Sequence, residues 1–342
     1  MRPSFQPRLI NDPFSDPGLF IPFLFEKRAL MFDLGALHNL SSKDLLKITH
    51  VFVTHTHIDH FIGFDTLLRT LLGREKKLHL FGPPDFFQHV EGKLSGYAWN
   101  LVSEYENDFT LEVNEVHYDK IFTKTYICQD RFKPKKPGSS RRFSSTLLEE
   151  PSFTVKGILL DHRIPCLGLA LCENFYVNII KEGLKELGLP VGPWLNRLKG
   201  AIYQKKDPQG DFVVNWKYKG KVVWEKRFRW AHLVKKIARI SPGQKIVYIT
   251  DVVGNPENSR KIIELAKGAN LLFIEAAFLD SDKELALKKY HLTAREAGEL
   301  AGKAGVKHMH LFHFSPRYKQ RTSDLEREAK DAFRILHSPD EP

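Results

Sequence analysis

Six consecutive residues constrain this chain more than any other feature. His55-Thr56-His57-Ile58-Asp59-His60 directly follow an apolar segment, residues 48–54, whose β-branched and aromatic side chains predict a strand. Three imidazoles and a carboxylate therefore gather at the carboxyl end of one strand. Imidazoles packed together are costly to bury unless something coordinates them, and this ligand set suits Zn²⁺ or Mn²⁺ better than a thiolate-preferring ion. We predict a metal site here, with a chance cluster as the alternative.

The rest of the chain alternates short apolar strands with helical stretches, which predicts an α/β layered architecture. One helix has a clear start and stop, since Thr293 and Glu296 form a capping-box pattern and Gly305 follows its last turn. Strands are expected at 29–33, 48–54, 78–81, 152–160, 245–250, 271–274 and 306–312, and helices at 62–72, 256–267 and 293–304.

Further ligand candidates should also end strands, because an α/β sheet gathers its site there. His162 and Asp251 each follow a predicted strand. In His308-Met309-His310-Leu311-Phe312-His313, alternation puts His308 and His310 on one strand face and His313 on the other. We expect His313 to be the ligand and the other two to be structural. Two sites result: Asp59, His60, His313 and a bridging Asp251 form one, and His55, His57, His162 and the same Asp251 form the other.

Composition limits the class of protein. With 342 residues the chain can bury a large core. Its three cysteines, Cys128, Cys166 and Cys172, have no repeated spacing, which argues against a disulfide framework and fits a reducing compartment. Its apolar runs are far shorter than the roughly 20 residues of a membrane span, and residues 1–4 show no signal-peptide pattern. We expect a soluble, cytoplasmic protein without a membrane partner.

The net charge of +11 is concentrated in one segment. Residues 195–239 contain thirteen basic and three acidic residues. The same segment also contains Trp216, Trp224 and Trp230. This stretch lies within 172–240, which we interpret as an inserted arm in a single domain, 1–342, and not as a second globular domain. A helix near 177–187 and a hairpin turning near 219–221 are expected in it. Basic residues interleaved with aromatics suit RNA phosphates and bases. An amphipathic hairpin packed on the body of the protein is the alternative.

Residues 133–142, rich in Lys, Pro, Gly and Ser, are expected to form a mobile loop.

Taken together, these motifs resemble the metallo-β-lactamase fold and, within it, the ribonuclease Z family of tRNA 3′-processing endonucleases. The similarity covers about residues 29 to 320. Besides the His-x-His-x-Asp-His motif, the matching elements are Phe32-Asp33-Leu34-Gly35, Asp161-His162-Arg163-Ile164-Pro165-Cys166-Leu167-Gly168, His291-Leu292-Thr293 and His313-Phe314-Ser315-Pro316-Arg317-Tyr318. Residues 188–195 are similar to the Gly-Pro tip of that family's tRNA-binding arm. Asp251-Val252-Val253 departs from the usual Asp-Thr-Arg, and Glu275 lacks its usual neighbouring His and Thr.

The resemblance implies a four-layer αβ/βα sandwich with the metals at one edge of two facing sheets. It implies two Zn²⁺ ions, or Mn²⁺, that polarise a water and stabilise charge on the scissile phosphate. Asp59 would orient or deprotonate the water, and His291, held by Glu275, would protonate the leaving 3′-oxygen. The implied partners are precursor tRNA or another RNA and a second copy in a homodimer. The implied substrate-binding residues are Arg317 and, in the arm, Gly192, Pro193, Arg197, Lys199, Lys205 and Lys206.

Three functions remain open from the sequence. The leading hypothesis is a dinuclear endoribonuclease that cleaves the 3′ trailer of precursor tRNA. A divergent branch of the same family, acting on another RNA, is a variant of this hypothesis. Another hydrolase of the same fold, a small-molecule phosphodiesterase or esterase, would not need the basic arm. A non-catalytic, metal-stabilised RNA-binding protein would not need His291.

Overall fold

The computed structural model describes residues 4–135, 138–204, 207, 209–218 and 221–336. The chain divides into two compact units. The larger consists of 5–148, 155–171 and 245–342, and the smaller of 1–4, 149–154 and 172–244. All the predicted metal ligands belong to the larger unit.

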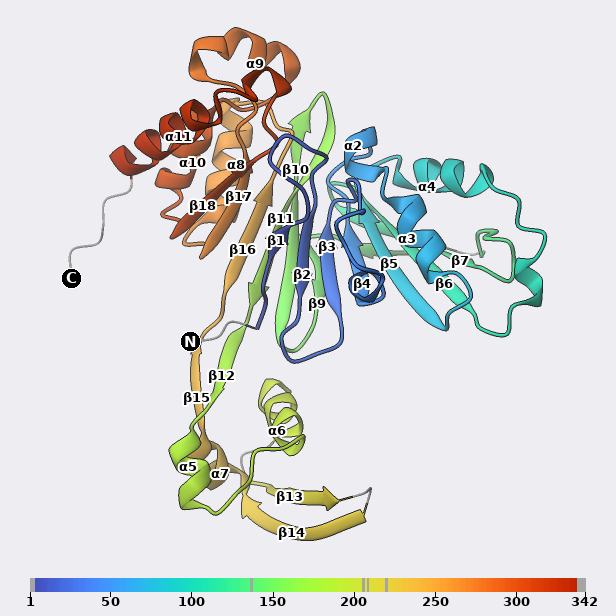
Figure 1. Ribbon diagram of the computed structural model, residues 1–342, viewed down its shortest axis with the longest axis vertical. Helices are drawn as coiled ribbons and strands as arrows, with labels where there is room; N and C mark the ends of the chain where they lie inside the picture. The colour runs from blue at the N-terminus through green and yellow to red at the C-terminus, as the bar shows by residue number, and fades with distance from the viewer. Residues whose placement is uncertain (1–3, 136–137, 205–206, 208, 219–220, 337–342) are drawn as a thin grey trace. The chain divides into compact units, whose positions relative to one another are not determined.

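The larger unit is built on two mixed sheets (Figure 1). The first sheet runs in the order β1 to β8, and β3 to β6 pair in parallel at its centre. Its strands are β1 (Arg8–Leu9), β2 (Leu19–Pro22), β3 (Ala29–Phe32), β4 (Ile48–Phe52), β5 (Lys76–Gly82), β6 (Phe109–Val116), β7 (Lys120–Ile127) and β8 (Ser139–Arg142). Parallel central strands bring their carboxyl ends to one edge, where the polar motif after β4 begins.

Helices cover one face of this first sheet. Leu67 and Leu71 of α3 (Phe64–Leu71) and Val90 of α4 (Phe86–Ser95) share one buried core with Val51 and Leu80 from the strands. The same part of the chain contains α1 (Ser42–Leu45), α2 (Ile58–Phe61) and the 3₁₀ turn η1 (Val102–Glu104). Burial of this apolar face, at about 25 cal/mol per Å², is what holds the helices on the sheet.

The second sheet has the order β18-β17-β16-β11-β10-β9, with β16, β17 and β18 parallel. Its strands are β9 (Thr146–Glu149), β10 (Phe153–His162), β11 (Ile164–Glu173), β16 (Lys245–Ile249), β17 (Leu271–Glu275) and β18 (His308–Phe312). The helical segments around it are α8 (Pro256–Ala266), η2 (Asp280–Asp282), α9 (Lys283–Lys289), α10 (Ala294–Lys303), η3 (Pro316–Tyr318) and α11 (Thr322–Leu336). The two sheets meet through Phe32 and Tyr248, whose rings lie 6.0 Å apart.

Helix α10 begins as predicted, because Thr293 and Glu296 complete a capping box. It then packs closely on α11, and a side chain at Gly298 would come within 2.1 Å of the Ala329 carbonyl oxygen.

The two sheets and their helices confirm the predicted α/β architecture with two facing sheets. Each predicted strand of the two sheets is present, with ends shifted by a few residues.

Two local predictions are wrong. The expected loop at 133–142 contains the edge strand β8, because Ser139–Arg142 pair antiparallel with β7. The expected helix at 177–187 is helical only in α5 (Lys181–Glu186), since its first residues belong to β12 (Phe175–Ile179), which pairs with β15 (Ala238–Pro242). In both places a partner strand distant in sequence overrides the local propensity.

The smaller unit has its own hydrophobic core. Trp194 and Leu198 of α6 (Trp194–Tyr203) pack with Leu233 of α7 (Trp230–Ile237) and with Phe212. Strands β13 (Asp211–Tyr218) and β14 (Lys221–Arg229) pair antiparallel, as expected for the predicted hairpin. Residues 219 and 220 of its predicted turn lie outside the described residues. Among the described residues, no helix is long and apolar enough to cross a membrane.

Candidate metal centre

The strand ends bring all seven predicted ligands to one edge of the larger unit. His55 and His57 follow β4, Asp59 and His60 lie on α2, His162 ends β10, Asp251 follows β16 and His313 follows β18. Two of the groups that could hold an ion are His55, His57, His162 and Asp251, and Asp59, His60 and His313. The ligand atoms within each group all lie within 4.8 Å of one another.

Asp251 lies between the two groups, and each of its carboxylate oxygens faces one of them. Oδ2 lies 3.6 Å from His55 Nε2 and 3.4 Å from His162 Nε2. Oδ1 lies 3.5 Å from His60 Nε2 and 3.0 Å from His313 Nδ1. A carboxylate in this position can bridge two ions.

The donor atoms themselves fit metal ions. Nε2 of His55, Nε2 of His60 and Nδ1 of His313 are buried. Each lies 3.0–3.6 Å from an oxygen of Asp251, but none of the three makes a hydrogen bond of normal geometry to any described residue. Buried polar atoms are normally paired, so three unpaired imidazole nitrogens in one place require an explanation. Divalent ions with nitrogen and oxygen ligands would satisfy all three.

A second layer of contacts orients the ligands. Asp33 Oδ2 lies 2.8 Å from His60 Nδ1, and the same side chain accepts hydrogen bonds from the Thr54 amide at 2.6 Å and the Tyr248 hydroxyl at 3.1 Å. His162 Nδ1 donates to the Tyr290 carbonyl at 2.7 Å. Such contacts fix the tautomer and the ring orientation of a metal-bound histidine.

Sequence reasoning assigned no role to Asp33 or to Tyr290. Asp33 follows β3 directly, so the rule that strand ends supply the site could have identified it. The Tyr290 contact uses a backbone carbonyl, which no residue pattern reveals.

Neighbouring charges shift the pKa values of several ligands. Burial alone would lower the pKa of His60, but the carboxylates of Asp251 and Asp33 raise it to about 10. Burial would raise the pKa of Asp251, whereas His313 and His60 hold it well below its usual range. Burial and the neighbouring His60 lower the pKa of His55. The centre thus keeps an ionised carboxylate among imidazoles.

Backbone conformation at the site is also unusual. Asp33, Arg163, Asp251 and His313 all have positive φ, at 58°, 64°, 50° and 58°. The left-handed region is unfavourable for residues other than glycine and persists where surrounding contacts enforce it. Three of these residues are a ligand or its immediate neighbour, so the chain bends sharply to present its ligands.

A histidine–glutamate pair borders the metal groups. His291 Nδ1 lies 2.8 Å from Glu275 Oε2, and the fully buried Glu275 also accepts hydrogen bonds from the amides of Val252 and Leu292. Burial alone would lower the pKa of His291, but the Glu275 carboxylate raises it. His291 therefore favours its protonated form, as a proton donor requires.

An open cavity of about 390 Å³ connects these groups. It is lined by His57, Asp59, His162, Asp251, Ala277, Phe278, Lys289, His291, His313, Phe314, Ser315 and Pro316. Lys289, which no sequence motif includes, is an exposed cation at its rim.

The predicted substrate-binding residues are more dispersed. Arg317 lies 3.6 Å from Asp282 and over the ring of Phe278. In the smaller unit, Gly192 and Pro193 precede α6, Arg197 donates to Asn215 at 2.7 Å and Lys199 lies over the Tyr176 ring. Lys205 and Lys206 lie outside the described residues.

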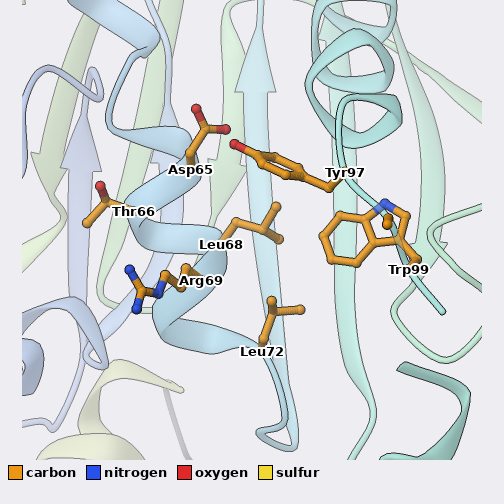
Figure 2. A pocket seen from close by; sticks show the side chains of 8 residues that line it. Asp65, Thr66, Leu68, Arg69, Leu72, Tyr97 and Trp99 are labelled. Atoms are coloured by element: carbon orange, nitrogen blue, oxygen red, sulfur yellow. The ribbon is translucent and has the colours of Figure 1, made fainter. Parts of the chain in front are cut away.

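A second cavity, of about 420 Å³, lies over α3 and shares no lining residue with the metal cavity. Figure 2 shows Leu68 on the helix and Leu72 directly after its last residue, facing Tyr97 and Trp99 from the segment after α4, with the Tyr97 hydroxyl pointing toward Asp65. None of the predicted site residues contributes to it.

Comparison with known proteins agrees with this geometry. The chain matches the beta-lactamase superfamily domain over residues 10–125 and 231–314. It is 28% identical to a protein named ribonuclease Z from Deinococcus radiodurans, over 85% of this chain and 83% of that one. It is 30% identical to another of that name from Brevibacillus brevis, over 91% of this chain and 83% of that one.

A solved structure supports the same fold. The metallo-β-lactamase fold protein YhfI from Bacillus subtilis is 16% identical, with a TM-score of 0.54 over 96% of this chain and 94% of that one. Together with the clustered histidines and aspartates of a metal-dependent hydrolase, these matches show that the chain belongs to the metallo-β-lactamase superfamily.

Proposed function

We propose that the protein is a dinuclear metal-dependent endoribonuclease that cleaves the 3′ trailer of precursor tRNA. The observation that carries the proposal is one cavity in which Asp251 faces two ligand groups while the His291–Glu275 pair lies beside them. The relatives named ribonuclease Z support the choice of substrate.

The residues divide into two metal sites that share one carboxylate. His55, His57 and His162 would hold one ion, Asp59, His60 and His313 the other, and Asp251 would bridge them. When bound, two Zn²⁺ or Mn²⁺ ions supply Lewis-acid charge at the scissile phosphate and activate a water.

Asp59 would orient the attacking water or accept its proton. Burial would raise the pKa of Asp59, but the hydrogen bond with His313 and the nearby His60 lower it to about 2, so it is a carboxylate at neutral pH. Its Oδ2 lies 3.3 Å from His313 Nε2, which fixes its orientation.

His291 would protonate the leaving 3′-oxygen. Because Nδ1 is engaged by Glu275, the proton offered to the substrate is the one on Nε2. Arg317 and the rim residue Lys289 would bind phosphates flanking the cleavage site, since both are cations beside the cavity.

The basic smaller unit would bind the body of the tRNA. Arg197 and Lys199 lie on α6, and Lys226, Arg227 and Arg229 follow along β14. Cations on a surface of this kind attract the RNA backbone through release of its counterions.

The homodimer implied by the family resemblance stays a prediction.

The test is cleavage of a 3′-extended precursor tRNA by metal-replete protein, with bis(p-nitrophenyl) phosphate assayed in parallel. We expect a single cut at the 3′ side of the tRNA, lost in Asp59→Ala. Hydrolysis of the small diester alone would contradict the RNA substrate and favour another phosphodiesterase. Two bound metals with neither activity would favour the non-catalytic RNA-binding alternative.

A further inference from the structure

One buried amide links two loops that carry predicted ligands. Asn258, in the first turn of α8, is 1% exposed. Its Oδ1 accepts a hydrogen bond from the Asp161 amide at 3.0 Å, and its Nδ2 donates to the carbonyls of Asp161 and Val253, both at 3.0 Å. The side chain therefore bonds only to backbone groups of two other segments.

Both segments lead directly to the metal centre. Asp161 immediately precedes His162, and Val253 is the second residue after Asp251. The two loops also meet directly, because the Val253 amide donates to the Asp161 carbonyl at 3.1 Å. Asn258 thus closes a small network that sets the position of one loop relative to the other.

These loops need external support. Arg163 and Asp251 adopt left-handed backbone conformations, which are unfavourable for residues other than glycine and persist only where surrounding contacts enforce them. The His162 and Asp251 side chains must also stay close, with Nε2 and Oδ2 3.4 Å apart. A rigid contact between the loops meets both requirements.

Helix formation does not explain the Asn258 side chain. Asn255 caps α8, since its Oδ1 accepts the Asn258 backbone amide at 2.7 Å. Helix α8 has its start signal without the Asn258 amide group, so the buried amide acts on the loops.

We propose that Asn258 is a positioning residue for the metal centre, holding His162 and Asp251 at the separation that one ion requires. The proposal rests on the metal-binding part of the proposed function and not on its RNA substrate. Partners that orient metal ligands typically contribute 10- to 100-fold to metal affinity.

The experiment compares Asn258→Ala with Asn255→Ala, a matched change in the same helical turn that removes the cap but no contact to the ligand loops. The full chain is stripped of metal and titrated with Zn²⁺ in competition with a chromophoric chelator. We expect about 10- to 100-fold weaker binding at one of two sites in Asn258→Ala. Asn255→Ala should bind both ions within about twofold of the wild type, although removal of the cap lowers the stability of the helix.

Cobalt provides a readout that general destabilisation would not move. In Co²⁺-loaded protein, the visible absorption spectrum should change in Asn258→Ala and stay as in wild type in Asn255→Ala. If Asn258→Ala does not fold, Asn258→Ser replaces it, because a hydroxyl fills more of the site and keeps one hydrogen-bonding group.

Wild-type affinity and spectrum in the Asn258 variants would overturn the proposal, and so would equal losses in both positions. Neither result touches the RNA substrate, because no RNA is present. Conversely, wild-type protein that binds two metals but leaves precursor tRNA intact would contradict the proposed function and leave the role of Asn258 standing.

Discussion

Asp251 is the residue on which the two ligand groups depend. Each oxygen of its buried carboxylate lies 3.0–3.6 Å from two histidine nitrogens, and the two oxygens face histidines of different ligand groups. His291 is the other decisive residue, because its hydrogen bond to Glu275 keeps a proton beside the same cavity. Asp251 therefore serves metal binding, whereas His291 serves proton transfer, and variants of the two residues test the two roles separately.

Removing the proton donor should therefore discriminate between leaving groups. In His291→Ala we expect kcat on precursor tRNA to fall by about 10²–10⁴, since an alkoxide leaves poorly without a proton. Hydrolysis of bis(p-nitrophenyl) phosphate should fall far less, because p-nitrophenolate is a stable anion. Steady-state kinetics on both substrates measures the difference.

His310→Ala is the control, as that imidazole stacks on Phe273 at 4.8 Å and belongs to none of the metal groups. Equal losses on both substrates in His291→Ala would mean that His291 serves the metals and not the leaving group.

His313 shows what residue patterns predict and what they miss. Strand alternation predicts that it faces away from His308 and His310. In the structure, however, His313 lies one residue beyond β18 with φ of 58°, so a left-handed bend and not the strand sets its direction. Asn258 was missed because its contacts with Asp161 span 97 residues of sequence, and only tertiary packing creates them. Asp33 follows β3, so its position at the site was predictable, but its contact with His60, 27 residues away, was not.

Three neighbouring strands, β4, β5 and β6, carry a row of polar side chains that does not line the metal cavity. His50 of β4, His79 of β5 and Glu112 of β6 are in register. The His50 and His79 rings stack at 4.5 Å, and His79 Nδ1 lies 2.9 Å from Glu112. Burial, with the nearby His79 and Arg28, lowers the pKa of His50 to about 3.

This row predicts acid sensitivity. The unfolded chain protonates His50 near its ordinary pKa of 6.5, whereas the folded chain does not until about pH 3. Its stabilising effect is therefore complete above pH 6.5 and is lost as the pH falls toward 3. Glu112 opposes this shift, while His79, Arg28 and Lys77 reinforce it.

Between pH 6.5 and 5 the wild type should lose free energy of unfolding as His50 is protonated in the unfolded chain. In His50→Phe, which preserves ring stacking, this loss should be smaller by roughly 1–2 kcal/mol. Urea unfolding at each pH measures it. Parallel losses in both proteins would show that His50 titrates normally in the fold.

The cations of the smaller unit should contribute to RNA binding. Replacing Arg197, Lys199, Lys205 and Lys206 with alanine should weaken RNA binding and reduce the slope of log affinity against log salt by about one for each phosphate that is no longer neutralised. The matched control removes four exposed cations of the larger unit, Lys43, Arg260, Lys303 and Lys330. Equal salt slopes in the two variants would exclude the arm as an RNA-binding element.

Across the whole molecule, the order of strands explains why so much was predictable. The first sheet has parallel strands at its centre and the second has three parallel strands, β16 to β18, at one side, so ligands that follow these strands meet at one edge. The prediction of the seven ligands used this rule together with the histidine cluster after β4 and the alternation of residues 308–313. The same rule says nothing about residues 177–179, which are strand because residues 238–240 of β15 pair with them. It also gives no information on the internal packing of residues 172–244, which form a core around Trp194 and Trp230.

The proposed chemistry requires a pair of metal ions bridged by one carboxylate, and counting the bound ions tests this requirement. Protein loaded with Zn²⁺, freed of excess metal and analysed by native mass spectrometry should hold two ions per chain, and Asp251→Ala at most one. A wild-type chain that binds a single ion, or an Asp251→Ala chain that still binds two, would contradict the dinuclear centre.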